Sequence, residues 1–192
     1  MTFFKSTLFI MSLIISFMAR CEMLRVAAVN FEIKGDSNLE QLDSQLELWT
    51  KKAKAKGASV ILFPELITLD LFSKNPKSSE VSKEILDLSK KSKIYSQKLV
   101  MLAKKYKMLL IGATTFVKEN TKTYNRAYII YPSGELKFQD KIYPTPWERK
   151  YKISAGDDLK TFNFRGYKFV VLTCHDAEFP SLSQKLTKIR PE

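Results

Sequence analysis

FVVLTCHDAEFP, residues 169–180, joins an apolar run directly to a polar segment, and Cys174 stands at the junction. The run Phe169 to Thr173 predicts a buried strand, and the residues after Cys174 predict a loop. A side chain at a strand exit is held by a rigid scaffold and can still be reached from solvent, which is a common position for a nucleophile. Cys174 is therefore the first candidate active-site residue.

Two more junctions of this kind lie upstream. The run Val60 to Phe63 leads to Glu65, and the run Glu135 to Asp140 leads to Lys141. An acid, a lysine and a cysteine, each at a strand exit, predict one assembled site. A thiol attacks best as the thiolate, so Glu65 could accept its proton. Lys141 could hold its charge against the oxyanion that forms when a thiolate adds to a carbonyl or nitrile carbon.

These residues, in this order, resemble the three motif blocks of the nitrilase or carbon–nitrogen hydrolase superfamily. The blocks are Phe63-Pro64-Glu65, then Lys141 with Glu148 seven residues on, then Cys174 to Pro180. The resemblance covers residues 24 to about 188 and is nearer to the amidase branches than to the true nitrilases. It implies an α/β fold of the nitrilase-like kind, an α-β-β-α sandwich that has a mixed sheet with outer helices.

The resemblance also implies a Glu-Lys-Cys triad and a reaction. Glu65 would be the base, Lys141 the oxyanion stabiliser and Cys174 the nucleophile, with Glu148 beside the lysine. The implied reaction is hydrolysis of a non-peptide carbon–nitrogen bond through a cysteine thioester; the bond is that of an amide, with a nitrile or a carbamoyl group as the less favoured alternatives. It would need no cofactor and no metal. The implied partner is a small-molecule amide, and we expect a complete form to be a homo-oligomer.

Three features depart from the family pattern. Many members carry a histidine at the position of Tyr143 and a tyrosine at the position of His175. Both positions border the pocket in the family, so the substrate stays open. Members also usually continue well past the cysteine, whereas this chain stops at Glu192. We therefore interpret residues 24 to 192 as an incomplete hydrolase domain without its C-terminal part, with an open sheet edge and impaired catalysis. The alternative is a nitrilase-like fragment that acts as a binding or interaction module.

Composition argues against several other classes of protein. His175 is the only histidine and neighbours Cys174, and adjacent side chains of an extended segment point to opposite faces, which excludes a Cys-His dyad. A single histidine also argues against a zinc site, and no Gly-x-Gly pair offers a phosphate loop. The net charge of +12 comes from 32 basic and 20 acidic residues, with many lysines scattered along one predicted helix. Because they form no arginine and aromatic patch, we expect no nucleic-acid binding.

Residues 1 to 23 predict a signal peptide or hydrophobic leader. Lys5 precedes the apolar run Thr7 to Ala19, whose thirteen residues suit a signal peptide and are too few to span a bilayer comfortably. We expect export to the periplasm or secretion, with membrane contact only through an uncleaved leader. The alternative is translation from Met23, which would give a cytoplasmic enzyme. Removal of the leader would leave Cys174 as the only cysteine.

Beyond the leader, helix and strand patterns alternate at first and give way to hairpins. We expect strands at 24–30, 58–63 and 109–116, and hairpins at 124–131/135–140 and 160–164/168–173. The first expected helix starts at a Ser37–Glu40 capping box and ends before Gly57, and a polar loop follows at 68–79. Further helices are expected at about 82–107, with a break near Ser92, and at 181–189. Parallel strands followed by hairpins imply a mixed sheet with helices on its outer face.

Overall fold

The computed structural model describes residues 23–192. The leader predicted at residues 1–23 lies outside this part of the chain except for Met23, so the leader and its role in export stay predictions. None of the helices within residues 23–192 combines the length and the apolar composition that a membrane crossing requires.

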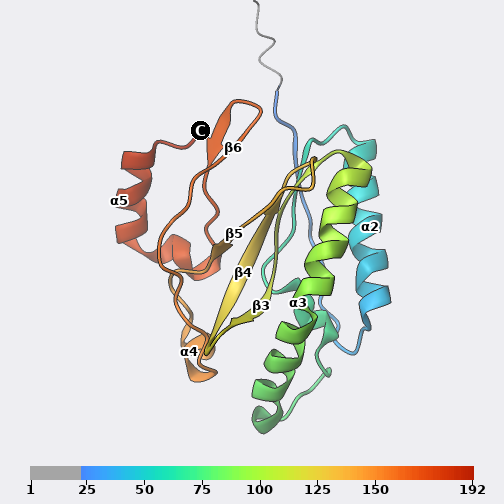
Figure 1. Ribbon diagram of the computed structural model, residues 1–192, viewed down its shortest axis with the longest axis vertical. Coiled ribbons are helices and arrows are strands. Elements are labelled where there is room, and N and C mark those ends of the chain that lie inside the picture. The colour runs from blue at the N-terminus through green and yellow to red at the C-terminus, as the bar shows by residue number, and fades with distance from the viewer. Residues whose placement is uncertain (1–22) are drawn as a thin grey trace, which may run out of the picture.

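A five-stranded mixed sheet forms the centre of the fold (Figure 1). Its strands lie in chain order: β1 (Val26–Ala28), β2 (Val60–Leu62), β3 (Leu109–Glu119), β4 (Lys122–Ile130) and β5 (Leu136–Asp140). The first three strands are parallel, and β4 and β5 continue the sheet as antiparallel hairpins. The predicted change from parallel strands to hairpins is therefore confirmed.

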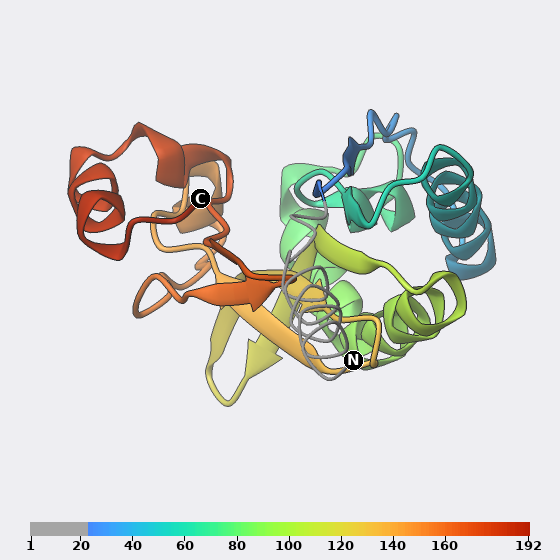
Figure 2. The ribbon, with the colours of Figure 1, turned by 90° about the horizontal axis from the view of Figure 1, so that it is seen from above.

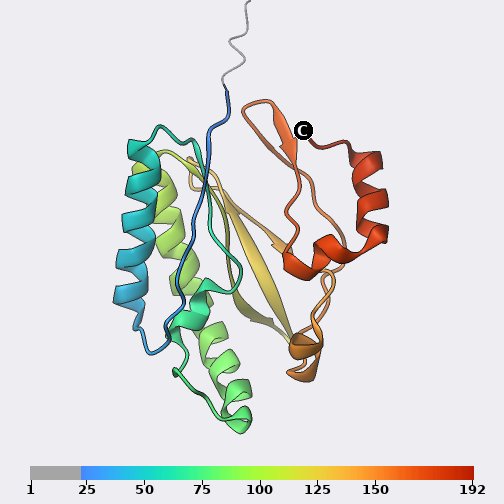
Figure 3. The same cartoon turned by 180° about the vertical axis from the view of Figure 1, so that it is seen from behind.

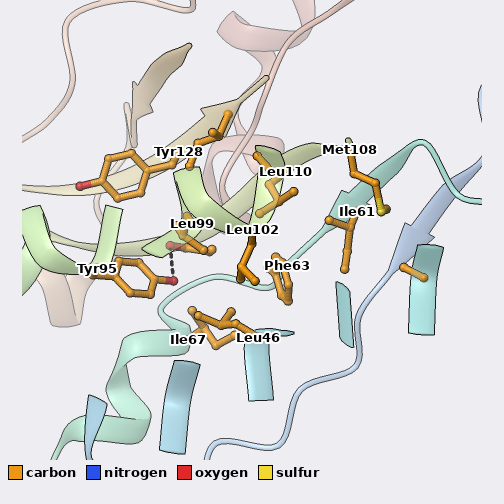
Figure 4. Packing of buried hydrophobic residues seen from close by; sticks show 14 of the residues in the cluster. Leu46, Ile61, Phe63, Ile67, Tyr95, Leu99, Leu102, Met108, Leu110 and Tyr128 are labelled. Carbon is orange, nitrogen blue, oxygen red and sulfur yellow. Dashed lines mark hydrogen bonds between the residues drawn. The ribbon is translucent and has the colours of Figure 1, made fainter. Parts of the chain in front are cut away.

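Two long helices, α2 (Leu39–Ala55) and α3 (Ser78–Tyr106), lie side by side on one face of the sheet (Figures 1 and 2). Their apolar side chains pack on the inward side chains of the strands, as Figure 4 shows for ten labelled residues. Tyr95 and Tyr128 add hydroxyl groups to this cluster, and the hydroxyl of Tyr95 donates to the carbonyl of Ala113 at 3.0 Å. Burial of this face accounts for most of the apolar core.

The opposite face carries the hairpin of β6 (Phe162–Phe164) and β7 (Tyr167–Phe169), with the short helix η2 (Cys174–Glu178) and α5 (Pro180–Ile189) further along the chain (Figures 2 and 3). Phe162 and Val171 pack against four sheet residues: Val60, Leu109, Ala127 and Ile129. This gives the order helix, sheet, hairpin, helix, and it confirms the predicted α-β-β-α arrangement. The cover is partial, because Val26 and Leu62 are 53% and 40% exposed.

The prediction of a strand over 168–173 is wrong beyond Phe169. β7 ends at Phe169, which pairs with Phe162, the first residue of β6. Residues 170–173 have no strand partner among the described residues, although Val171 and Thr173 are buried. An apolar run reports burial, and burial against a sheet face does not require ladder hydrogen bonds.

Three helix predictions also need correction. The capping box of α2 is formed by Asn38 and Gln41, one residue after the predicted pair, because asparagine is at least as good a cap as serine. The predicted loop at 68–79 contains the short helix η1 (Ile67–Leu71), and α3 already begins at Ser78. α3 is unbroken at Ser92, whose hydroxyl donates to the carbonyl of residue 89 within the helix.

Candidate active site

Lys141 is the centre of a buried charge cluster. It follows β5 directly and is 1% exposed, and its Nζ lies 2.7 Å from Glu65 Oε1 and 2.8 Å from Glu148 Oε2. Burial opposes the charge on Lys141, but the hydrogen bonds to Glu148 and Glu65 outweigh burial and raise its pKa. The ammonium group therefore stays charged at neutral pH.

Glu148 is fixed by the short helix α4 (Pro146–Lys150). Thr145 caps this helix, since its side chain accepts from Glu148 N at 3.2 Å and Thr145 N donates to Glu148 Oε2 at 2.7 Å. Burial by itself would raise the pKa of Glu148, but the hydrogen bonds from Lys141, Thr145 and Asn125 lower it overall. Glu148 is 0% exposed and acts as a permanent counter-ion of Lys141.

Glu65 is positioned by a bulge in the neighbouring strand. The pairing of β3 with β4 shifts register between Gly112 and Thr115, and Thr114 Oγ1 there accepts from Leu66 N at 2.6 Å. Gly112 has a φ of +87°, and a Cβ at this residue would collide with the carbonyl of Phe63. Only glycine lets the strand approach the segment before Glu65 so closely.

Cys174 starts η2 in a strained conformation, with a φ of 46°. A non-glycine residue in this region costs free energy, and such outliers concentrate at functional sites. Cys174 is exposed, and together with Glu65 it lines a pocket of about 210 Å³. Desolvation by the surrounding protein and the carboxylate of Glu65 raise the pKa of the thiol, whereas Lys141 acts to lower it. The thiol is therefore neutral at pH 7 and needs a base to become a nucleophile.

Asp176 ties the cysteine segment to the lysine segment. It is 0% exposed, its Oδ1 accepts from Ile142 N at 3.0 Å and from Tyr143 N at 2.7 Å, and its Oδ2 accepts from Thr173 N at 3.1 Å. Burial raises the pKa of Asp176 in spite of these three hydrogen bonds. The backbone on both sides of the site is thus held by one side chain.

We expect Asp176→Ala to lower the free energy of unfolding by about 3 kcal/mol, because it leaves three N–H groups without an acceptor, one of them buried and two partly buried. Urea unfolding followed by circular dichroism measures the loss. The exposed Asp157→Ala is the matched control, and it is expected to cause no measurable change. Equal stability of the two variants would contradict the role of Asp176.

Tyr143 and His175, which depart from the family pattern, lie where the lysine segment meets the cysteine segment. His175 Nδ1 lies 3.0 Å from the carbonyl oxygen of Tyr143, and the Tyr143 ring stacks on Phe179 with centroids 3.7 Å apart. The Tyr143 hydroxyl lies 2.8 Å from Ser181 Oγ. Neither Tyr143 nor His175 is among the described residues that line the 210 Å³ pocket. These two side chains join the lysine segment to the cysteine segment.

The structure brings Glu65, Lys141 and Glu148 into direct contact and puts Cys174 on the same pocket as Glu65. Two residues that the sequence did not predict also hold the site: Asn125, which donates to both carboxylates, and Asp176. Thr145 had a usable signal, because Thr-x-x-Glu is a capping box. Within residues 23–192 no group of three or more His, Cys, Asp or Glu side chains could hold a metal ion.

Comparison with known proteins finds relatives that are named as hydrolases. The probable hydrolase YhcX of Bacillus subtilis is 32% identical over 162 residues, which are 84% of this chain and 31% of that protein. The omega-amidase YafV of Escherichia coli K12 is 25% identical over 153 residues, which are 79% of this chain and 53% of that protein. The chain thus spans between about a third and about half of the length of these relatives.

The fold matches solved amidase structures. An amidase from Nesterenkonia sp. aligns with a TM-score of 0.68 at 18% identity, over 83% of this chain and 58% of that one. Other structures of this amidase are described as a complex with butyramide and as the product of Michael addition of acrylamide at the active-site cysteine. A sequence model of the family Carbon-nitrogen hydrolase matches residues 25–188. Since this match takes in most of the sequence, the chain belongs to the carbon–nitrogen hydrolase family.

Proposed function

We propose that this chain hydrolyses the carbon–nitrogen bond of a small amide through a thioester on Cys174. The observation that carries the proposal is the charge cluster, in which a buried lysine lies between two glutamates and one of these glutamates shares a pocket with a strained cysteine. Family membership and the amidase names of its relatives support the same reaction.

In the first half-reaction, Glu65 takes the proton of the Cys174 thiol as the sulfur adds to the amide carbon. A carbon–sulfur bond forms, and the carbonyl electron pair moves to oxygen. The positive charge of Lys141, which is bound to Glu65 and held in place by Glu148, stabilises that oxyanion electrostatically from beside the pocket. The intermediate collapses, the carbon–nitrogen bond breaks, and Glu65 returns its proton to the departing nitrogen. Ammonia or an amine leaves, and a thioester remains.

In the second half-reaction, Glu65 takes a proton from water, and the resulting hydroxide adds to the thioester carbon. The new tetrahedral intermediate expels the Cys174 sulfur, which regains its proton from Glu65, and the carboxylic acid leaves. Each proton that Glu65 accepts is returned within the same half-reaction, so no external acid or base is consumed.

The pocket favours small, aliphatic acyl groups. Its volume is about 210 Å³, and its lining includes Val29, Leu62, Phe63 and Leu172. No charged side chain besides Glu65 lines it among the described residues, so an amide without a second charge suits it best. Butyramide and acrylamide, which appear with the Nesterenkonia amidase, are suitable first substrates.

The test is to incubate the full chain with propionamide, butyramide and acrylamide and to measure the ammonia released. After an acid quench, mass spectrometry should find an acyl group on the Cys174 peptide. Absence of both ammonia and adduct with every amide would contradict the proposal and favour the alternative of a binding fragment.

Glu65→Gln should separate proton transfer from electrostatics. Turnover is expected to fall by about 10²- to 10⁴-fold, because glutamine cannot accept the proton. Alkylation of Cys174 by iodoacetamide near pH 8 should become faster, because the Glu65 charge that raises the thiol pKa is gone.

The control is Glu178→Gln, which removes an exposed carboxylate from the same short helix as Cys174 and should change both rates little. Slower alkylation in Glu65→Gln, or unchanged turnover, would contradict the role of Glu65.

A further inference from the structure

We propose that Asn125 is the positioning residue of the base: it holds one carboxylate oxygen of Glu65 so that the other oxygen faces the thiol. This inference rests on the proposed function, because it assigns a task to Glu65 in the same site.

The side chain of Asn125 donates a hydrogen bond to each of the two glutamates. It lies in β4 and is 0% exposed, and its Nδ2 donates to Glu65 Oε1 at 2.7 Å and to Glu148 Oε1 at 2.8 Å. The two hydrogens of the amide group are thus both used. Ionised carboxylates only accept, so they also fix which end of the Asn125 amide points at them.

The oxygen of Asn125 indicates what the residue is for. Oδ1 is buried and has no hydrogen-bond partner among residues 23–192. A buried, unpartnered oxygen destabilises a fold, and a leucine of similar size would avoid that cost. An asparagine at this place therefore serves its two donors and not the packing of the sheet.

The two donors to Glu65 converge on the same atom. Asn125 Nδ2 and Lys141 Nζ both donate to Oε1, each at 2.7 Å. Among residues 23–192, these two are the nitrogen atoms that donate a hydrogen bond to the Glu65 side chain. Oε2 is left for the proton of Cys174, which lines the same pocket. The backbone reinforces the arrangement, because the carbonyl of Asn125 accepts from Lys141 N at 2.9 Å. Asn125 thereby sets both the base and the lysine from one strand position.

The test is a double-mutant cycle on the reactivity of the thiol, and it needs no substrate. The full chain is alkylated with iodoacetamide over a range of pH, and modification of the Cys174 peptide is followed by mass spectrometry. The four proteins are the wild type, Glu65→Gln, Asn125→Leu and the double variant. Glu65→Gln should move the midpoint of the wild type to lower pH. In the Asn125→Leu background the same substitution should move it by less than half as much, because Glu65 no longer faces the thiol.

The outcomes separate the two proposals. An undiminished shift in the Asn125→Leu background overturns the positioning role and leaves the proposed function intact. If Glu65→Gln does not shift the midpoint when Asn125 is intact, Glu65 does not interact with the thiol. That result overturns the proposed function and this inference with it.

Asn125→Ser, which keeps one donor, is measured in parallel and decides the question if the leucine variant fails to fold. In the Asn125→Ser background the Glu65→Gln shift should be smaller than in the wild type, and an undiminished shift there overturns the positioning role. With an amide substrate, Asn125→Leu should lower kcat by on the order of 10²-fold and leave KM nearly unchanged, because misplacement of a reacting group affects the transition state most. A change confined to KM would contradict the inference.

Discussion

Cys174→Ala is expected to lower amide turnover by on the order of 10⁶-fold, down to the rate of a sample without protein. The thiol supplies the atom that bonds to the substrate carbon, so no other group of the site can replace it. The acyl adduct on the Cys174 peptide should vanish as well. Ammonia release and mass spectrometry of the quenched protein measure the two effects.

Folding should not suffer in this variant. Cys174 is exposed and strained, and alanine removes only its sulfur. The urea midpoint is therefore expected to stay close to that of the wild type. Cys174→Ser is the matched control for shape, and it should retain at most a trace of turnover, because a hydroxyl is a weaker nucleophile without a stronger base. Full turnover in the alanine variant would remove Cys174 from the mechanism.

Lys141→Met should be the most destabilising single change in the site. It leaves the buried carboxylate of Glu148 and that of Glu65 without their cation, and breaking a buried ion pair from one side costs about 3–5 kcal/mol. Turnover should fall by about 10²- to 10³-fold as well, because the oxyanion loses its charge partner. Urea unfolding and ammonia release measure the two losses.

The pH dependence of stability should change sign in this variant. In the wild type the lowered pKa of Glu148 contributes stability above its unfolded value of 4.5, and this is lost as pH falls through the folded value. The raised pKa of Lys141 contributes stability below 10.5, and this is lost as pH rises through the folded value. Without Lys141, burial raises the pKa of Glu148, so the variant should regain stability as pH falls from 7 towards 5.

The matched control is Lys137→Met, in the strand β5 that leads to Lys141, where the lysine side chain and its partner Glu135 are both exposed. Its free energy of unfolding should stay within experimental error of the wild type, because exposed ion pairs contribute little. If both lysine variants unfold at the same urea concentration, the buried ion pairs of Lys141 do not stabilise the fold.

The sequence by itself determined the elements and the residues with reactive side chains. Apolar periodicity located both long helices and the strands of the main sheet, because burial of one face dictates a local repeat. Glu65, Lys141, Glu148 and Cys174 could be picked out because each follows a recognisable element or stands at a fixed spacing from another. Patterns of this kind depend only on residues that are close in the sequence, so they can be recognised without the tertiary structure.

Tertiary structure alone decided which groups hold those residues. Asn125 lies 60 residues from Glu65 along the chain, and Asp176 lies 34 residues from Ile142, so no local pattern could pair them. The end of β7 at Phe169 was equally hidden, because strand pairing depends on a partner elsewhere in the chain. The positive φ of Cys174 likewise has no signal in the neighbouring residues, and the hydrogen bonds by which Asp176 joins this segment to the lysine segment link distant parts of the chain. Hydrogen bonds across the fold are set by three-dimensional proximity, and that is why the support of the site became visible only in the structure.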